Sequence, residues 1–249
     1  MKQNESLAET RAVFVLFAQK PNKTEQSPEY GFFCGGFYGR INENSKNAEG
    51  GRSMTNAPKT VLAIHDLPGF GRAALSVIVP VLSTLGVQTV ALPTAVLSTH
   101  TGGLGTPAKL ANPGYGPAAL EHYHRLGVKF DCIYSGYLAD AAQAKLVEQA
   151  FELWPRAFKV VDPVLGDGGR LYSGLGADMV PAMYSLCSKA DLIVPNVTEA
   201  ALLLGDPLPG VGSAEQAAAQ AARLTRVAPQ VVVTGVTGIG GGRYIGCVG

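Results

Sequence analysis

Apolar and polar positions alternate in blocks along the chain from residue 61 onward. Short apolar runs that suit strands occur at 61–64, 88–93, 132–135, 159–162, 192–194 and 230–234. Segments with helical periodicity alternate with them, at 72–85, 117–126, 139–154, 177–188, 198–204 and 213–227. Repeated strand–helix units of this kind predict an α/β fold with a mostly parallel sheet and helices on both faces.

Residues 1–53 have a different character. They are rich in Asn, Lys, Glu, Ser and Gly and hold little apolar surface that can offset the entropy of ordering. We therefore interpret 1–53 as a disordered or non-native N-terminal extension. Met54 opens a short polar stretch directly before the first apolar run, so we predict that Met54 is the natural start and that residues 54–249 form the folded domain.

Ligands of parallel α/β sheets bind at the carboxyl ends of the strands, so the residues that follow each predicted strand are candidates for a site. The segment HDLPGFGR at 65–72 follows the first strand and places Asp66 at this edge. Its glycines allow either a close approach of backbone to a ligand or a sharp turn. Spacing alone favours a structural turn.

The segment after the second strand, 93–103, is dense in hydroxyl groups and ends in two glycines. It offers donors and acceptors for a small polar ligand, and a solvated loop fits its composition equally. The polar side chains concerned are Ser98, Thr99, His100 and Thr101.

Acidic residues follow the strand at 159–162. Asp162 ends this strand, and Asp167 comes five residues later on a glycine-rich loop. Two carboxylates at such a position can hold Mg²⁺ directly or through water. A helix cap together with a turn aspartate is equally compatible with the spacing.

Two more strand ends carry candidates. Asn196 and Glu199 follow the strand at 192–194, although Thr198 can also be a simple N-cap with the glutamate beside it in the first turn. Thr234 ends the last strand, and the glycines that follow it can cradle a phosphate or form a hairpin turn.

Composition and charge narrow the class of protein. The formal net charge of +1 gives no basic excess for nucleic acid and fits an enzyme that acts on a small molecule. The four cysteines form no CxxC pair, which is typical of reduced thiols in a cytoplasmic protein. The apolar run at 12–18 is too short to span a membrane, and His122 and His124 are two apart, so we predict surface residues rather than metal ligands.

The order of these segments resembles the pyridoxal/pyridoxamine kinases. The segments that carry the resemblance are IHDLPGFGR at 64–72, LSTHTGG at 97–103, YSGYL at 134–138, VDPVLGD at 161–167, VPNVTEA at 194–200 and VVTG at 232–235. The resemblance covers about 180 residues and is strongest to the bacterial pyridoxamine kinase branch. It implies a ribokinase-like three-layer α/β sandwich with a mostly parallel central sheet.

The resemblance also implies roles for the matching residues. The pocket for the B6 vitamer is lined by Asp66, Thr101 and Tyr137. The site for ATP runs along Asp162, Asp167, Tyr172, Glu199 and Thr234. Asp162 and Asp167 organise Mg²⁺ within it. The implied reaction transfers the γ-phosphoryl group of ATP to the 5′-hydroxymethyl group of pyridoxal, pyridoxamine or pyridoxine.

One part of the family pattern has no counterpart in the sequence. The family's Gly-Thr-Gly-Asp loop holds the transferring phosphate and supplies the catalytic base, and no such motif follows Thr234. We therefore expect a domain whose C-terminal part is missing, no catalytic residue from this motif, and a weak or inactive kinase. The alternatives are a hydroxymethylpyrimidine-type kinase and a non-catalytic protein that binds pyridoxal or nucleotide. Because members of the family are usually homodimers, the resemblance also implies a homodimer.

Overall fold

A seven-stranded sheet forms the centre of the protein in the computed structural model, which describes residues 58–101, 104–172, 174–176, 178–209, 213–237 and 245–248. Its strand order is β3-β2-β1-β4-β5-β8-β9, and all its pairs are parallel except that of β2 with the edge strand β3. The strands are β1 (Thr60–Phe70), β2 (Gln88–Thr99), β3 (Lys109–Leu110), β4 (Cys132–Ser135), β5 (Phe158–Val161), β8 (Leu192–Ile193) and β9 (Gln230–Val231). The α/β class with a mostly parallel sheet is therefore confirmed.

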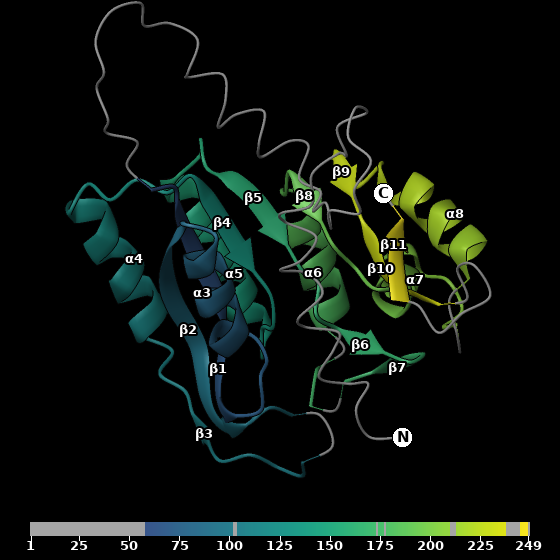
Figure 1. Ribbon diagram of the computed structural model, residues 1–249, viewed down its shortest axis with the longest axis horizontal. Helices are drawn as coiled ribbons and strands as arrows, with labels where there is room; N and C mark the ends of the chain where they lie inside the picture. The colour runs from purple at the N-terminus through teal and green to yellow at the C-terminus, as the bar shows by residue number, and fades with distance from the viewer. Residues whose placement is uncertain are drawn as a thin grey trace, which may run out of the picture.

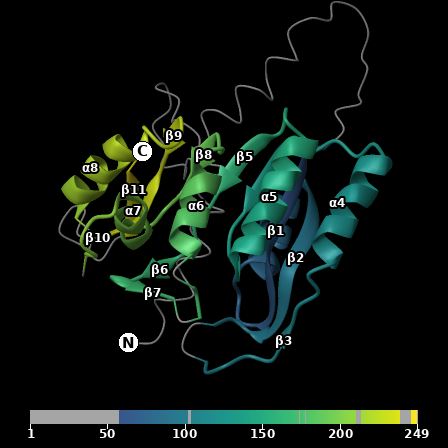
Figure 2. The same ribbon diagram turned by 180° about the vertical axis from the view of Figure 1, so that it is seen from behind.

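Helices cover the two faces of the sheet unequally. Helix α3 (Leu75–Thr84) lies on the face seen in Figure 1, whereas α4, α5 and α6 lie across the opposite face (Figure 2). The helices besides α3 are α4 (Tyr115–Arg125), α5 (Ala141–Leu153), α6 (Met179–Cys187), α7 (Val197–Leu204) and α8 (Ala214–Leu224). Two small antiparallel sheets complete the fold, β6 (Gly166–Asp167) with β7 (Arg170–Leu171) and β10 (Val233–Thr237) with β11 (Ile245–Val248).

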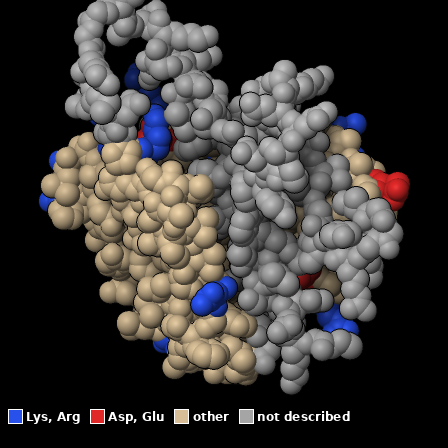
Figure 3. Space-filling view, in the orientation of Figure 1, with Lys and Arg blue, Asp and Glu red and all other residues tan. Residues whose placement is uncertain are grey.

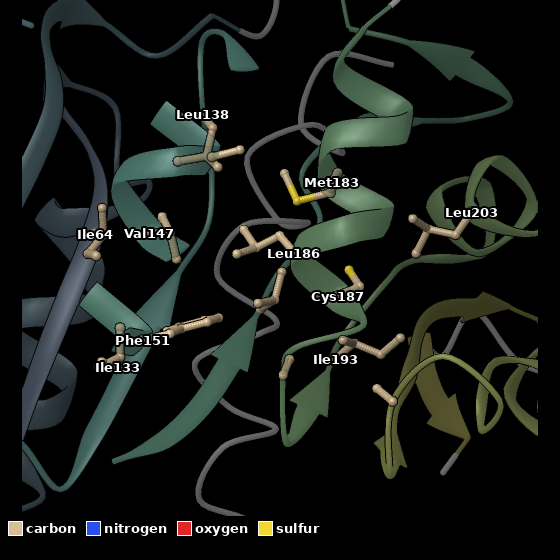
Figure 4. Close-up of a cluster of buried hydrophobic side chains, with 14 of the residues drawn as sticks. Ile64, Ile133, Leu138, Val147, Phe151, Met183, Leu186, Cys187, Ile193 and Leu203 are labelled. Carbon is tan, nitrogen blue, oxygen red and sulfur yellow. The ribbon is translucent and has the colours of Figure 1, made fainter. Parts of the chain in front are cut away.

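Alternation along the strands divides the core into two clusters, because successive side chains of a strand point to opposite faces. Leu62 and Ile64 of β1 belong to the larger cluster, with Val147 of α5 and Met183 of α6 (Figure 4). Val61 of β1 and its neighbour Ala63 belong to the smaller cluster, with Leu75, Ile78 and Leu82 of α3. Strands buried on both faces explain the continuous apolar runs in the sequence.

Strands β1 and β2 are longer than the sequence predicts. The predicted turn at 65–72 is wrong, since Leu67–Phe70 continue β1 and pair with the end of β2. The interpretation of 93–103 as a loop is wrong for 93–99, because β2 continues through Pro93 to Thr99. Proline removes one ladder hydrogen bond, but β2 still pairs on both sides of Pro93 and gives β1 its partner.

Smaller differences concern helix ends and the last strand. The predicted helix at 72–85 begins only at Leu75, and it is continuous through Pro80. The predicted strand at 230–234 is divided between β9 and β10. None of the described helices is long and apolar enough to cross a membrane. The proposed extension at 1–53 and Met54 lie outside the described residues.

Candidate active site

The carboxyl ends of β5 and β8 carry a dense hydrogen-bond network. Asn196 caps helix α7, and its Oδ1 accepts hydrogen bonds from the backbone N–H groups of Thr198 and Glu199, each at 2.9 Å. The Glu199 carboxylate accepts in return from the Asn196 N–H at 2.7 Å, which completes a capping box. The alternative in which Thr198 caps the helix is therefore wrong, because the asparagine two residues earlier occupies the cap.

The same residues hold the β6–β7 hairpin, which carries Asp167. Asn196 Nδ2 donates to the Gly166 carbonyl at 2.8 Å, and Thr198 Oγ1 accepts from the Gly169 N–H at 3.0 Å. Glu199 Oε1 accepts from the Leu165 N–H at 3.2 Å. The cap of α7 and the acidic loop are thus one hydrogen-bonded unit.

Negative charge gathers in this unit. Burial raises the pKa of Glu199 well above its usual value, and the charges of Asp162 and then Asp167 raise it further, against two backbone hydrogen bonds that lower it. Asp162 is buried at the end of β5, whereas Asp167 is partly exposed. Carboxylates that raise the pKa of a neighbouring carboxyl group in this way favour a cation close by.

Among the described residues, no group of three or more His, Cys, Asp and Glu side chains is placed to hold a metal by itself. Mg²⁺ typically uses one or two carboxylates together with water and substrate phosphates. Asp162 and Asp167 fit that role, and they do not form a metal site of their own.

The carboxyl ends of β1 and β4 are built differently. Asp66 is 4% exposed and lies opposite Thr94 and Ala95, where the pairing of β1 with β2 shifts by one residue. Bulges of this kind redirect side chains at sites. Burial raises the pKa of Asp66 to about 6, against the lowering effect of its own backbone N–H.

Several buried polar atoms at this end have no hydrogen-bond partner among the described residues, which is uncommon in folded proteins. They include His65 Nε2, Asp66 Oδ1 and Ser135 Oγ. His65 is neutral, because burial lowers its pKa to about 3. Its ring lies edge-on to Tyr134 with ring centroids 4.4 Å apart.

The family model described as phosphomethylpyrimidine kinase matches residues 82–244. The chain belongs to the phosphomethylpyrimidine kinase family. It is 28% identical over 190 residues to the pyridoxal kinase PdxY of Deinococcus radiodurans, covering 71% of this chain and 61% of that protein.

Solved structures of this kinase family share the fold. The pyridoxal kinase of Lactobacillus plantarum matches with a TM-score of 0.66 and 39% identity, covering 77% of this chain and 68% of that one. A Bacteroides thetaiotaomicron structure with pyridoxal, assigned to the phosphomethylpyrimidine kinases, matches with a TM-score of 0.68 and 39% identity, covering 72% of this chain and 64% of that one. These likenesses confirm the ribokinase-like fold and the resemblance to pyridoxal kinases, while the chain spans less than two thirds of the Deinococcus and Bacteroides proteins.

The predicted site residues of this family member fall into two groups. The group at β5, β8 and β10 brings Asp162, Asp167, Glu199 and Thr234 together, with Thr234 bridged to Asn196. Tyr172 is near them, since its N–H donates to the Leu165 carbonyl at 3.0 Å.

The second group lies at β1 and β4. Asp66 is within β1, and the partly buried Tyr137 follows β4 by two residues. Thr94 Oγ1 donates to the Tyr137 carbonyl at 3.3 Å. Thr101 is exposed beyond the end of β2, and the glycines at 102–103 lie outside the described residues.

Sequence reasoning missed several residues of this site. They are His65, Thr94, Ser135 and Gln143. Each has an ordinary structural interpretation in the sequence. The pairing of β1 with β2 and β4 brings the first three together, and Gln143 reaches Thr94 from helix α5. On the face shown in Figure 3, the described Lys and Arg side chains are scattered rather than gathered.

The remaining predictions concern histidine and cysteine. His122 and His124 are exposed on α4, as predicted. Cys132 and Cys187 are buried, and neither forms a disulfide with a described residue. Burial and the nearby charges of Glu199 and Asp162 raise the pKa of Cys187, so this thiol is unreactive. Cys34 and the side chain of Cys247 lie outside the described residues.

Proposed function

We propose that this protein phosphorylates the 5′-hydroxymethyl group of pyridoxal, pyridoxamine or pyridoxine with ATP and thereby salvages vitamin B6. The observation that carries the proposal is the division of one sheet edge into two unlike halves. The acidic half suits a nucleotide with its cation, and the half at β1 and β4, with its buried polar atoms, suits a small heteroaromatic ring. The identity of 39% to a pyridoxal kinase and to a structure that holds pyridoxal supports this choice of substrate.

The vitamer would lie at the β1 and β4 end. Asp66 has one buried oxygen without a partner, and a carboxyl group with a pKa of about 6 can either donate or accept a hydrogen bond near neutral pH. Tyr137 would supply an aromatic wall, and Thr101 would close the pocket from the end of β2. These assignments follow the matching family positions.

The nucleotide would lie along the β5, β8 and β10 end, beside Asp167, Tyr172, Glu199 and Thr234. Asp162 and Asp167 would hold Mg²⁺ through water and phosphate oxygens. Bound Mg²⁺ would neutralise charge on the phosphates during transfer. Glu199 would act by holding the hairpin in place, since both its oxygens already accept backbone hydrogen bonds. We assign the role of proton acceptor to no residue of this chain.

Two measurements on the purified chain test the proposal. Titration calorimetry with pyridoxal and with ATP–Mg²⁺ measures binding, and a coupled assay of ADP release measures turnover. We expect both ligands to bind, each without needing the other. A chain that binds neither ligand would contradict the proposal, and binding without ADP release would favour a non-catalytic binding protein.

A hydroxymethylpyrimidine-type kinase is the second candidate, because the matching family model is that of phosphomethylpyrimidine kinase. Parallel titrations with pyridoxal and with hydroxymethylpyrimidine distinguish the two. The candidate with the lower dissociation constant is the favoured substrate. We also propose a homodimer in the cytoplasm, and sedimentation velocity measures the oligomeric state.

A further inference from the structure

The segment that follows β4 is held from two sides. Residues 136–139 leave the sheet at Ser135 and run to the start of α5, and they carry Tyr137. The Gly136 N–H donates to the Ile64 carbonyl at 3.1 Å, so the segment begins in contact with β1. The path of the rest of the segment depends on two side chains, Gln143 and His65, to which the proposed function assigns no role.

Gln143 holds the far end of the segment. Its Oε1 accepts from the Ala139 N–H at 2.7 Å, and its Nε2 donates to the Thr94 carbonyl at 2.9 Å. Its own N–H is bonded to the cap residue Asp140 at 3.0 Å, which fixes it in the first turn of α5. One amide group therefore ties the bulge of β2 to the loop after β4.

His65 holds the near end. A Cβ atom on Gly136 would lie 2.2 Å from His65 Cε1 and Nδ1, so the imidazole ring fills the space of a side chain at that position. The ring is 3% exposed, and Tyr134 lies against it. Because Gly136 is bonded to β1 and packed on this ring, its backbone has little freedom.

We propose that Gln143 and His65 are positioning residues that fix residues 136–139, and with them Tyr137, against the vitamer site. The proposal rests on the proposed function for the ligand. The contacts of Gln143 and His65 with residues 136–139, which we call the bracket, are a property of the free protein. Thr94 adds to it, since its hydroxyl holds the Tyr137 carbonyl while its own carbonyl accepts from Gln143. The substrate wall is thus assembled from β1, β2 and α5.

Hydrogen exchange in the ligand-free protein tests the bracket. Gln143→Met removes both hydrogen bonds and keeps length and helix propensity. We expect the Ala139 amide to exchange about fivefold faster, since one such bond contributes about 1 kcal/mol. Gln143→Glu keeps the acceptor and should retain this protection. The control is Gln149→Met, because Gln149 is partly buried on the same helix and makes no side-chain hydrogen bond to the described residues.

Titration calorimetry then links the bracket to binding. Gln143→Met should weaken pyridoxal binding about tenfold and leave ATP–Mg²⁺ binding unchanged, whereas a general loss of structure would weaken both. His65→Ala should do the same, and His65→Phe, which keeps a flat ring beside Gly136, should bind within about threefold of wild type.

The outcomes separate this inference from the proposed function. Unchanged exchange at Ala139 in Gln143→Met, with normal pyridoxal binding, would overturn the bracket and leave the proposed function intact. A wild-type chain that does not bind pyridoxal would overturn both the proposed function and the role of the bracket in binding.

Discussion

The two halves of the site edge differ in how their polar groups are satisfied. At β5 and β8, the side chains of Asn196, Thr198 and Glu199 are bonded to backbone groups of the same unit. At β1 and β4, His65, Asp66 and Ser135 each keep a buried atom without a partner in the part of the chain that the structure describes. The first half is built before any ligand arrives, whereas the second carries a cost in stability that a ligand can offset. Loss of a polar group at β5 and β8 should therefore lower stability, whereas neutralising Asp66 or removing the Ser135 hydroxyl should raise it.

The largest effect is expected at Glu199. Glu199→Ala leaves the buried N–H groups of Asn196 and Leu165 without acceptors and breaks the capping box. We expect a loss of about 3 kcal/mol in the free energy of unfolding. Urea denaturation measures it, with Glu199→Gln as the milder control because its amide oxygen still accepts one bond. If Glu199→Ala lowers the free energy of unfolding by less than an ordinary surface substitution does, the proposed difference between the two halves is contradicted.

Asp66→Asn should have the opposite sign. Burial raises the pKa of Asp66 from 3.8 to about 6, so the folded state binds the proton more tightly than the unfolded state. The wild type therefore loses stability as pH rises from about 4 to about 6, by roughly 3 kcal/mol in all. The asparagine variant lacks this loss.

Denaturation curves of both proteins at pH 4 and pH 8 check this prediction. The stability of the wild type relative to Asp66→Asn should be lower at pH 8 than at pH 4. Pyridoxal binding should be weaker in the variant despite its gain in stability. Equal pH dependence in the two proteins would show that Asp66 is not held in a desolvated position.

Gly136→Ala tests how tightly the second half is packed. The added methyl group would meet the His65 ring, so we expect a loss of about 2 kcal/mol. In the double variant with His65→Ala, the ring is gone and the two losses should not add. Strictly additive losses in the four-member cycle would show that the ring and the glycine are not coupled.

The sequence predicted the first half better than the second, for a physical reason. Asn196 and Glu199 follow directly after a predicted strand, so the local order of the sequence pointed to both, although it left Thr198 as the alternative cap. His65, Thr94 and Ser135 come together only through the pairing of three strands, and Gln143 reaches them from helix α5, which no local pattern specifies. Asp66 was identified from the resemblance, but its position within β1 was not. Pro68 and the nearby glycines predict a turn when the local sequence is considered without the neighbouring strand.

Ser135→Ala is expected to have the smallest effect on stability of these substitutions. The Ser135 side chain is fully buried, and its Oγ has no partner among the described residues. A buried hydroxyl without a hydrogen bond costs free energy that a methyl group in the same space does not. We therefore expect Ser135→Ala to stabilise the free protein by up to about 1 kcal/mol, measured by urea denaturation beside the control Ser188→Ala, whose hydroxyl is exposed and bonded to the Ser185 carbonyl. If Ser135→Ala destabilises the free protein instead, its hydroxyl is already engaged, and the β1 and β4 end is no less satisfied than the β5 and β8 end.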